Sequence, residues 1–250
     1  MTRAAIDFAF LHGGGQGGWV WDETIAALRQ QTNGEVRTFA LDVPGCGVKR
    51  GRDTAELTVD DVTVELLSDL TNAGMEDIIL VGHSQAGTIM PRLTQMRPDL
   101  FRRLIYVSCS SPLPGQTILQ MMGTCLHGES EDEVGWPTES KARDVRERYP
   151  RMFCNDMTEA ETAAFLAKLD RDAWPMKSYA ETNWRYDHLD HTPATYVVCS
   201  RDGILPVAWQ EKFADRFKAR RVVRLDAGHQ AMSTRPHALA ELLLREAVAE

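Results

Sequence analysis

Three residues of the types that together perform nucleophilic catalysis each follow a run of residues with the composition of a β-strand. They are Ser84, Asp202 and His229, and the runs before them are residues 78–81, 194–199 and 221–225. If these runs are parallel strands, their carboxyl ends share one edge of a sheet, where ligands bind. A serine becomes an effective nucleophile when a histidine takes its proton, and a buried carboxylate orients that histidine. The pattern therefore predicts a catalytic triad at this edge.

The surroundings of Ser84 are typical of a nucleophile elbow, a sharp strand-to-helix turn. The apolar residues 78–81 indicate a strand buried on both faces, Gly82 permits the turn, and residues 85–95 have helical composition. Such a turn lifts the serine hydroxyl off the sheet. The usual pattern is G-x-S-x-G, whereas here Ala86 stands at the last position. A small residue is what close packing of helix and strand requires there, and the alternative is a buried serine in an ordinary turn.

A loop rich in glycine follows the first expected strand, residues 5–11. It begins at His12, which we expect to brace the loop, and its glycines let the backbone expose N–H groups. A developing oxyanion needs two backbone donors. We expect one to be the N–H of Gln85, at the start of the elbow helix, and the other to be the N–H of Gly14.

The glycine loop has a second interpretation, as a dinucleotide-binding turn. That turn also needs an acidic residue at the end of the next strand, and Asp42 does follow the expected strand 36–41. The chain turns away immediately at residues 43–47, however, and nucleotide binding explains neither Ser84 nor the C-terminal motifs. We therefore favour the oxyanion loop.

The apolar periodicity predicts one α/β core with helices on both faces of its sheet. Because every connection between expected strands is helical or long, the six-stranded sheet should be mainly parallel. The expected strands are residues 5–11, 36–41, 78–81, 104–108, 194–199 and 221–225, and the expected helices are 22–31, 59–73, 85–95, 158–169, 207–217 and 236–246.

The alternation of strand and helix breaks down after the fourth expected strand. We expect residues 111–190 to form a cap over the strand ends, inserted into a core domain of residues 1–110 and 191–250. Its aromatic and methionine content favours a pocket-lining role, with a long surface excursion as the alternative. The expected pocket residues are Met121, Met122, Trp136 and Trp174 from the cap, with Gly13 and Gln230 from the core.

Composition restricts the classes of partner. The formal charge of −8 argues against nucleic acid and anionic membrane, and no apolar stretch is long enough to span a bilayer. The five cysteines show no metal-ligand spacing. We expect the chain to open directly on a core strand, with no signal peptide before it. We expect a cytoplasmic protein with reduced thiols, no metal, no cofactor and a small-molecule substrate, and we leave a homodimer open.

These motifs resemble one branch of the α/β-hydrolase fold family. The resemblance lies in the segments His12 to Trp21, Val81-Gly82-His83-Ser84, Ser200-Arg201-Asp202 and Gly228-His229. The order of nucleophile, acid and base along the chain is also that of α/β-hydrolases. The branch contains plant methylesterases, hydroxynitrile lyases and bacterial esterase relatives. The resemblance covers nearly the whole chain except the cap. It implies hydrolysis of small esters without a cofactor, with Gly14 and Gln85 at the oxyanion-hole positions.

Two positions argue against a hydroxynitrile lyase. Lyases of this branch carry a threonine directly after the position matching His12 and a lysine directly after the catalytic histidine, and here these positions are Gly13 and Gln230. Glutamine is neutral and cannot supply a full charge to departing cyanide. The sequence therefore predicts a serine hydrolase that cleaves a small to medium, largely apolar carboxylic ester through an acyl-enzyme. A carbon–carbon bond hydrolase or lyase with the same triad, and a non-catalytic small-ligand binding module, are the alternatives.

Overall fold

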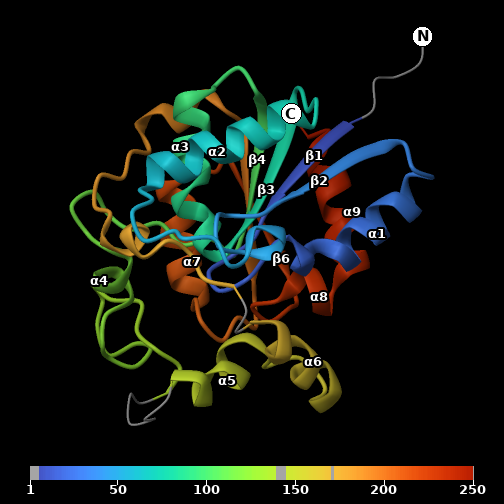
Figure 1. The fold of residues 1–250 in the computed structure, drawn as a ribbon. Helices are drawn as coiled ribbons and strands as arrows, with labels where there is room; N and C mark the ends of the chain where they lie inside the picture. The colour runs from blue at the N-terminus through green and yellow to red at the C-terminus, as the bar shows by residue number, and fades with distance from the viewer. Residues whose placement is uncertain (1–5, 139–144, 170–171, 250) are drawn as a thin grey trace.

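A single parallel sheet of six strands forms the centre of the protein (Figure 1). The computed structural model describes residues 6–138, 145–169 and 172–249. The strand order is β2-β1-β3-β4-β5-β6, and each neighbouring pair is parallel. The strands are β1 Ile6–Leu11, β2 Val36–Leu41, β3 Ile78–His83, β4 Phe101–Val107, β5 Ala194–Cys199 and β6 Arg221–Leu225. The expected parallel architecture is confirmed.

Helices cover both faces of the sheet, and successive residues of a strand point to opposite faces, so the central strands contribute to two apolar clusters. In β1, Phe8 and Phe10 belong to one apolar cluster, whereas Ala9 and Leu11 belong to the other. The first cluster packs under α1 (Asp22–Gln31) and α9 (Pro236–Ala247), and the second under α2 (Val59–Asn72), α3 (Met90–Met96) and α7 (Val207–Arg216). Figure 1 shows α1 and α9 together on one side, with α2 and α3 on the other.

The elbow helix differs from the single helix expected at 85–95. A 3-10 turn, η3, covers Ser84–Thr88, and α3 begins only at Met90. Pro91 stands in the first turn of α3, where its missing N–H costs nothing. The other expected helices and strands agree with the structure to within a few residues at their ends.

Between β4 and β5, the described residues form α-helices of 5 to 11 residues, turns and one isolated β-bridge between Leu126 and Trp136. The α-helices are α4 Ile118–Met122, α5 Tyr149–Phe153 and α6 Glu159–Leu169. In Figure 1, α5 and α6 lie beyond one end of the sheet. We call residues 108–193 the inserted segment. The described residues do not include 1–5, 139–144, 170–171 and 250. Residue 5 of the first expected strand and two stretches of the expected cap therefore lie outside them.

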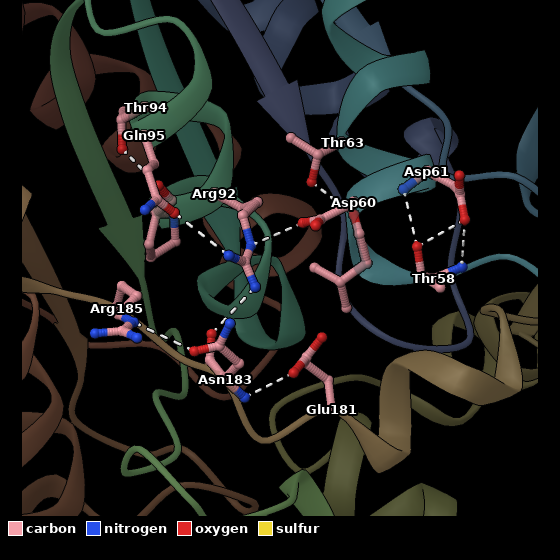
Figure 2. A network of polar contacts seen from close by, with 12 residues as sticks. Thr58, Asp60, Asp61, Thr63, Arg92, Thr94, Gln95, Glu181, Asn183 and Arg185 are labelled. Atoms are coloured by element: carbon pink, nitrogen blue, oxygen red, sulfur yellow. Dashed lines mark hydrogen bonds and ion pairs between the residues drawn. The ribbon is translucent and has the colours of Figure 1, made fainter.

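Arg92 of α3 ties the returning end of the inserted segment to the core (Figure 2). Its guanidinium donates to the carbonyl of Asn183 at 3.1 Å and forms an ion pair of 3.1 Å with Asp60 of α2. The two connecting stretches also contact each other, because the N–H of Gly115 donates to the carbonyl of Thr182 at 2.8 Å. The segment therefore leaves and rejoins the sheet at one place. None of the helices among the residues described is both long and apolar enough to cross a membrane.

Candidate active site

Ser84 stands on a sharp turn directly after β3. Its φ of 53° lies in the left-handed region, which non-glycine residues occupy mainly where the surrounding structure enforces it. Gly82 and Gly87 make that turn possible: a Cβ on Gly82 would lie 2.2 Å from Sδ of Met90, and one on Gly87 would lie 2.4 Å from the carbonyl oxygen of Ser110. The close crossing therefore falls at Gly87, which explains why Ala86 is tolerated at the last position of the usual pattern.

Asp202 and His229 are brought together from the ends of β5 and β6. Nδ1 of His229 lies 2.7 Å from Oδ2 of Asp202, and both side chains are wholly buried. The same Oδ2 accepts a hydrogen bond of 2.5 Å from the hydroxyl of Ser108, while Oδ1 accepts from the N–H groups of Ile204 and Leu205 at 2.7 and 2.9 Å. The carboxylate is therefore fully held, and it fixes the orientation of the imidazole.

The charge state of Asp202 follows from these contacts. Burial alone would raise the pKa of Asp202, but His229, the Ser108 hydroxyl and the backbone N–H of Leu205 together hold it below its ordinary value. The carboxyl group is thus ionised near neutral pH. Nε2 of His229 is buried, and within the described part of the chain it has no hydrogen-bond partner.

Two further histidines support the site from behind. Nε2 of His83 lies 2.9 Å from the carbonyl oxygen of His229, and burial and the neighbouring His229 hold the pKa of His83 well below its ordinary value. Nε2 of His12 accepts from the N–H of Val43 at 3.1 Å, and its Nδ1 lies 2.8 Å from the carbonyl oxygen of Gly13. Burial also lowers the pKa of His12. Both imidazole rings are therefore neutral, and their contacts hold the neighbouring loops in place.

One cavity of about 340 Å³ opens onto Ser84. Of the sequence-predicted residues, it is lined by Gly14, Gln85, Met121, Met122 and Trp136. The apolar part of its lining comes almost wholly from the inserted segment and from the loop after β5: Ile118, Leu119, Met152, Phe153, Leu169, Ile204 and Leu205. The arrangement places an apolar compartment directly beside the serine.

Three expected pocket residues lie outside this lining. Gly13 lies under the serine, since a Cβ on it would be 2.9 Å from Cβ of Ser84. Trp174 is buried, donates from Nε1 to the carbonyl of Gly13 at 3.1 Å and packs edge-on against His12. Gln230, the residue after His229, is wholly buried, and its side-chain amide has no hydrogen-bond partner in the described ranges. Gly13 and Trp174 shape the glycine loop from behind.

Sequence reasoning did not assign roles to several residues that hold the site. Ser108 contacts Asp202, and it follows a buried strand in the same way as Ser84, so its position was a usable signal. Asp156 accepts from the N–H of Gly228 at 2.7 Å, and Asn155 donates to the carbonyl of Arg201 at 2.5 Å. Both lie in the inserted segment, where no periodicity indicates which core loop a side chain will reach.

Asp172 joins the inserted segment to the loops after β1 and β2. Its wholly buried carboxylate accepts from the Arg50 guanidinium at 2.6 and 2.8 Å, from Nε1 of Trp19 at 2.9 Å and from the N–H of Gly47 at 2.6 Å. Burial raises the pKa of Asp172, but these donors together hold it below its ordinary value. No three His, Cys, Asp or Glu side chains converge as metal ligands among the residues described.

A comparison with known protein families shows to which family this chain belongs. The model of the alpha/beta hydrolase family matches residues 8–242. The chain belongs to the alpha/beta hydrolase family. Among the relatives of this hydrolase, Methylesterase 18 of Arabidopsis thaliana is 27% identical over 270 residues, covering 96% of each chain. Probable esterase PIR7A of Oryza sativa is 24% identical over 262 residues, covering 98% of each chain.

Solved structures agree with the fold. An extracellular alpha/beta-hydrolase from a Paenibacillus species superimposes with a TM-score of 0.78 at 18% sequence identity. The superposition covers 98% of this chain and 100% of the other. At this level of identity the likeness concerns the fold, and the expected resemblance to the branch of plant methylesterases and bacterial esterases is confirmed by the named relatives.

Proposed function

We propose that this protein is a serine hydrolase that cleaves a small to medium, largely apolar carboxylic ester. The observation that carries the proposal is the combination of a left-handed serine after β3, a buried Asp202–His229 pair and a cavity open to that serine. Relatives named methylesterase and esterase support ester-bond hydrolysis as the activity.

The proposed reaction proceeds through an acyl-enzyme. Oγ of Ser84 attacks the ester carbonyl carbon while Nε2 of His229 accepts its proton, and the negative charge on the carbonyl oxygen is met by the N–H groups of Gly14 and Gln85. His229 then protonates the leaving alkoxide, and the alcohol departs. In the second half a water molecule, deprotonated by the same histidine, attacks the acyl carbon and releases the acid and the serine.

The electrostatics of the site suit this cycle. An ionised Asp202 stabilises the imidazolium that forms when His229 takes the serine proton. The pair is shielded from water, so this attraction acts in a medium of low dielectric constant. We propose that the part of the inserted segment that lines the cavity acts as the cap expected at 111–190 and that its apolar side chains bind the hydrocarbon part of the ester.

The test is hydrolysis of 4-nitrophenyl butyrate by the wild-type protein and by Ser84→Ala. The variant should fold normally, because it removes one hydroxyl, and should lose about four orders of magnitude in kcat. Ser233→Ala, at a serine near the molecule's surface on α8 (Ala231–Thr234), is the matched control and should keep the wild-type rate. Retention of a tenth of the activity by Ser84→Ala would show that another residue is the nucleophile.

A cyanohydrin substrate provides a second arm of the same test. Because Gly13 offers no hydroxyl and Gln230 no charge, we expect no cyanide release from mandelonitrile above the buffer rate. Enzyme-dependent release that disappears in Ser84→Ala would instead identify a lyase using the same triad. A protein that binds small esters without turnover or a burst of acyl-enzyme would be a binding module.

A further inference from the structure

The cavity at Ser84 has a mainly apolar lining that also contains several polar side chains, among them Ser110, Tyr149 and Asp172. We use the term polar corner for Gln85 and Tyr179, which both line the cavity. The hydroxyl of Tyr179 interacts with the side chain of Gln85, and burial raises the pKa of this phenol, so it stays protonated. Of the other polar residues in the lining, Asp172 is already engaged by Arg50, Trp19 and Gly47. The cavity therefore offers a bound molecule a polar group as well as a large apolar surface.

The Gln85 amide has hydrogen-bonding capacity that the protein does not use. Only 8% of the residue is exposed, and its Nε2 has no acceptor within the described part of the chain. Buried polar groups in folded proteins are nearly always paired, and an unpaired one is costly. A primary amide has two N–H donors, so a ligand that brings an oxygen acceptor into the corner would satisfy a group the fold leaves unpaired.

The position of the amide identifies which half of an ester it would meet. Oε1 of Gln85 lies only 2.2 Å from the place a Cβ on Gly14 would occupy, so the side chain lies over the loop expected to hold the oxyanion. The hydroxyl of Tyr179 lies 3.6 Å from the same point. The leaving alcohol, by contrast, must lie against His229 to receive its proton. A group beside Gly14 therefore belongs to the acyl half.

We infer that the ester cleaved here carries an oxygen acceptor, such as an ether, hydroxyl or carbonyl group, at the α or β position of its acyl chain, and that the side-chain amide of Gln85, positioned by Tyr179, binds this oxygen. The inference rests on the proposed ester hydrolysis and adds the substrate class. It gives Gln85 two roles, with its backbone N–H directed to the carbonyl oxygen and its side chain reading the acyl substituent.

The test compares two esters of nearly equal shape. 4-Nitrophenyl methoxyacetate and 4-nitrophenyl butyrate differ by one ether oxygen in place of a methylene, and the measured quantity is the ratio of their kcat/KM values. The intrinsic reactivities of the two esters differ, but that difference is the same for every variant and cancels when variants are compared. A second pair, 2-methoxyethyl acetate and butyl acetate, places the same oxygen in the alcohol half.

We expect Gln85→Met, which keeps the length of the side chain, to lower the methoxyacetate-to-butyrate ratio about tenfold, as the loss of one buried hydrogen bond would. Tyr179→Phe should lower it by a smaller factor, and the ratio for the alcohol pair should not change. Ile118→Val, on the apolar wall, is the matched control and should alter both acyl esters by the same factor. Thermal melting checks that each variant is folded. If Gln85→Met does not fold, the ratio measured with Tyr179→Phe decides the question.

Two results would contradict the inference while leaving the proposed function intact. One is an acyl ratio that stays within about twofold of wild type in both variants, since even a weak hydrogen bond exceeds that change. The other is an effect confined to the alcohol pair, which would place the polar corner on the leaving-group side. Failure of the wild-type protein to hydrolyse any of the four esters would instead count against the proposed function itself.

Discussion

The carboxyl edge of the sheet and the inserted segment are built by different means. At the edge, Ser84 and Asp202 are positioned by the ends of β3 and β5, whose residues are buried along their whole length. Strand register therefore fixes the backbone positions of the groups proposed to react. In the inserted segment, α4 and α5 have only five residues each, and such short helices have little stability of their own.

The inserted segment compensates by hydrogen bonds to the loops that follow the strands. Each of four such bonds joins one of its side chains to a different loop at the catalytic edge: Trp174 to Gly13 O, Asp172 to Gly47 N, Asn155 to Arg201 O and Asp156 to Gly228 N. The sheet positions the residues of the proposed triad, whereas the inserted segment supplies most of the apolar lining of the cavity and holds the loops that follow the strands.

Asp202→Asn is the sharpest test of whether the strand ends position the proposed triad. The substitution keeps the shape of the side chain but presents the wrong group to Nδ1 of His229 and removes the charge that stabilises the imidazolium. We expect kcat for 4-nitrophenyl butyrate to fall about ten-thousand-fold with the melting behaviour nearly retained. Asp226→Asn, at an exposed carboxylate after β6, should leave kcat at the wild-type value. Near-normal turnover by Asp202→Asn would move the acid of the triad elsewhere.

A smaller effect is expected where the inserted segment braces the histidine loop. Asp156→Asn removes the charge from a buried carboxylate that holds the N–H of Gly228, next to His229, and the hydroxyl of Thr234. We expect kcat to fall about tenfold with KM little changed, because a misplaced histidine slows the reaction without altering substrate binding. Glu159→Gln, an exposed carboxylate in the same segment, is the control. A change in KM alone would show that the segment only shapes the cavity.

The apolar wall should affect the choice of acyl chain rather than the chemistry. Met122→Ala removes a side chain of α4 that lines the cavity. We expect kcat/KM for 4-nitrophenyl hexanoate to fall about tenfold, with the acetate much less affected, because only the longer chain reaches the lost surface. Met96→Ala, on an exposed part of α3, should leave both esters unchanged. Equal losses for the two esters would mean that α4 acts on the triad instead.

Thiol alkylation should produce the smallest effect. Cys46, Cys109 and Cys199 are buried in the core, and burial raises the pKa of each of these thiols, so they are poor nucleophiles. Cys125 of the inserted segment is partly exposed and lies outside the cavity lining. Iodoacetamide should therefore label Cys125 first, as mass spectrometry would show, and leave activity within about twofold of the untreated protein. Strong inactivation that Cys125→Ser abolishes would place this residue near the substrate.

The sequence predicted the edge of the sheet far better than the inserted segment. Periodicity and flanking turns located β2, β5 and β6 to the residue, β5 as a buried apolar run and the partly exposed edge strands β2 and β6 through their β-branched residues and the turns beside them. The same strand ends led to the prediction of Ser84, Asp202 and His229 as the triad, and in the structure Asp202 and His229 are in contact. The contacts of Asp156 and Tyr179 could not be predicted, because they depend on where short helices come to rest after the chain folds. The pause in the elbow helix at Ile89 was likewise missed, since close packing at Gly87 overrides local helical preference.

The two connecting stretches of the inserted segment meet where the chain leaves and rejoins the sheet, through Gly115 and Thr182 and through the Arg92 clamp on Asn183. The spacing between β4 and β5 is therefore independent of how much chain lies between those stretches. Lengthening a closed loop adds little conformational cost. A change in the length of this segment would then alter the lining of the cavity without moving the strand ends that carry the proposed triad.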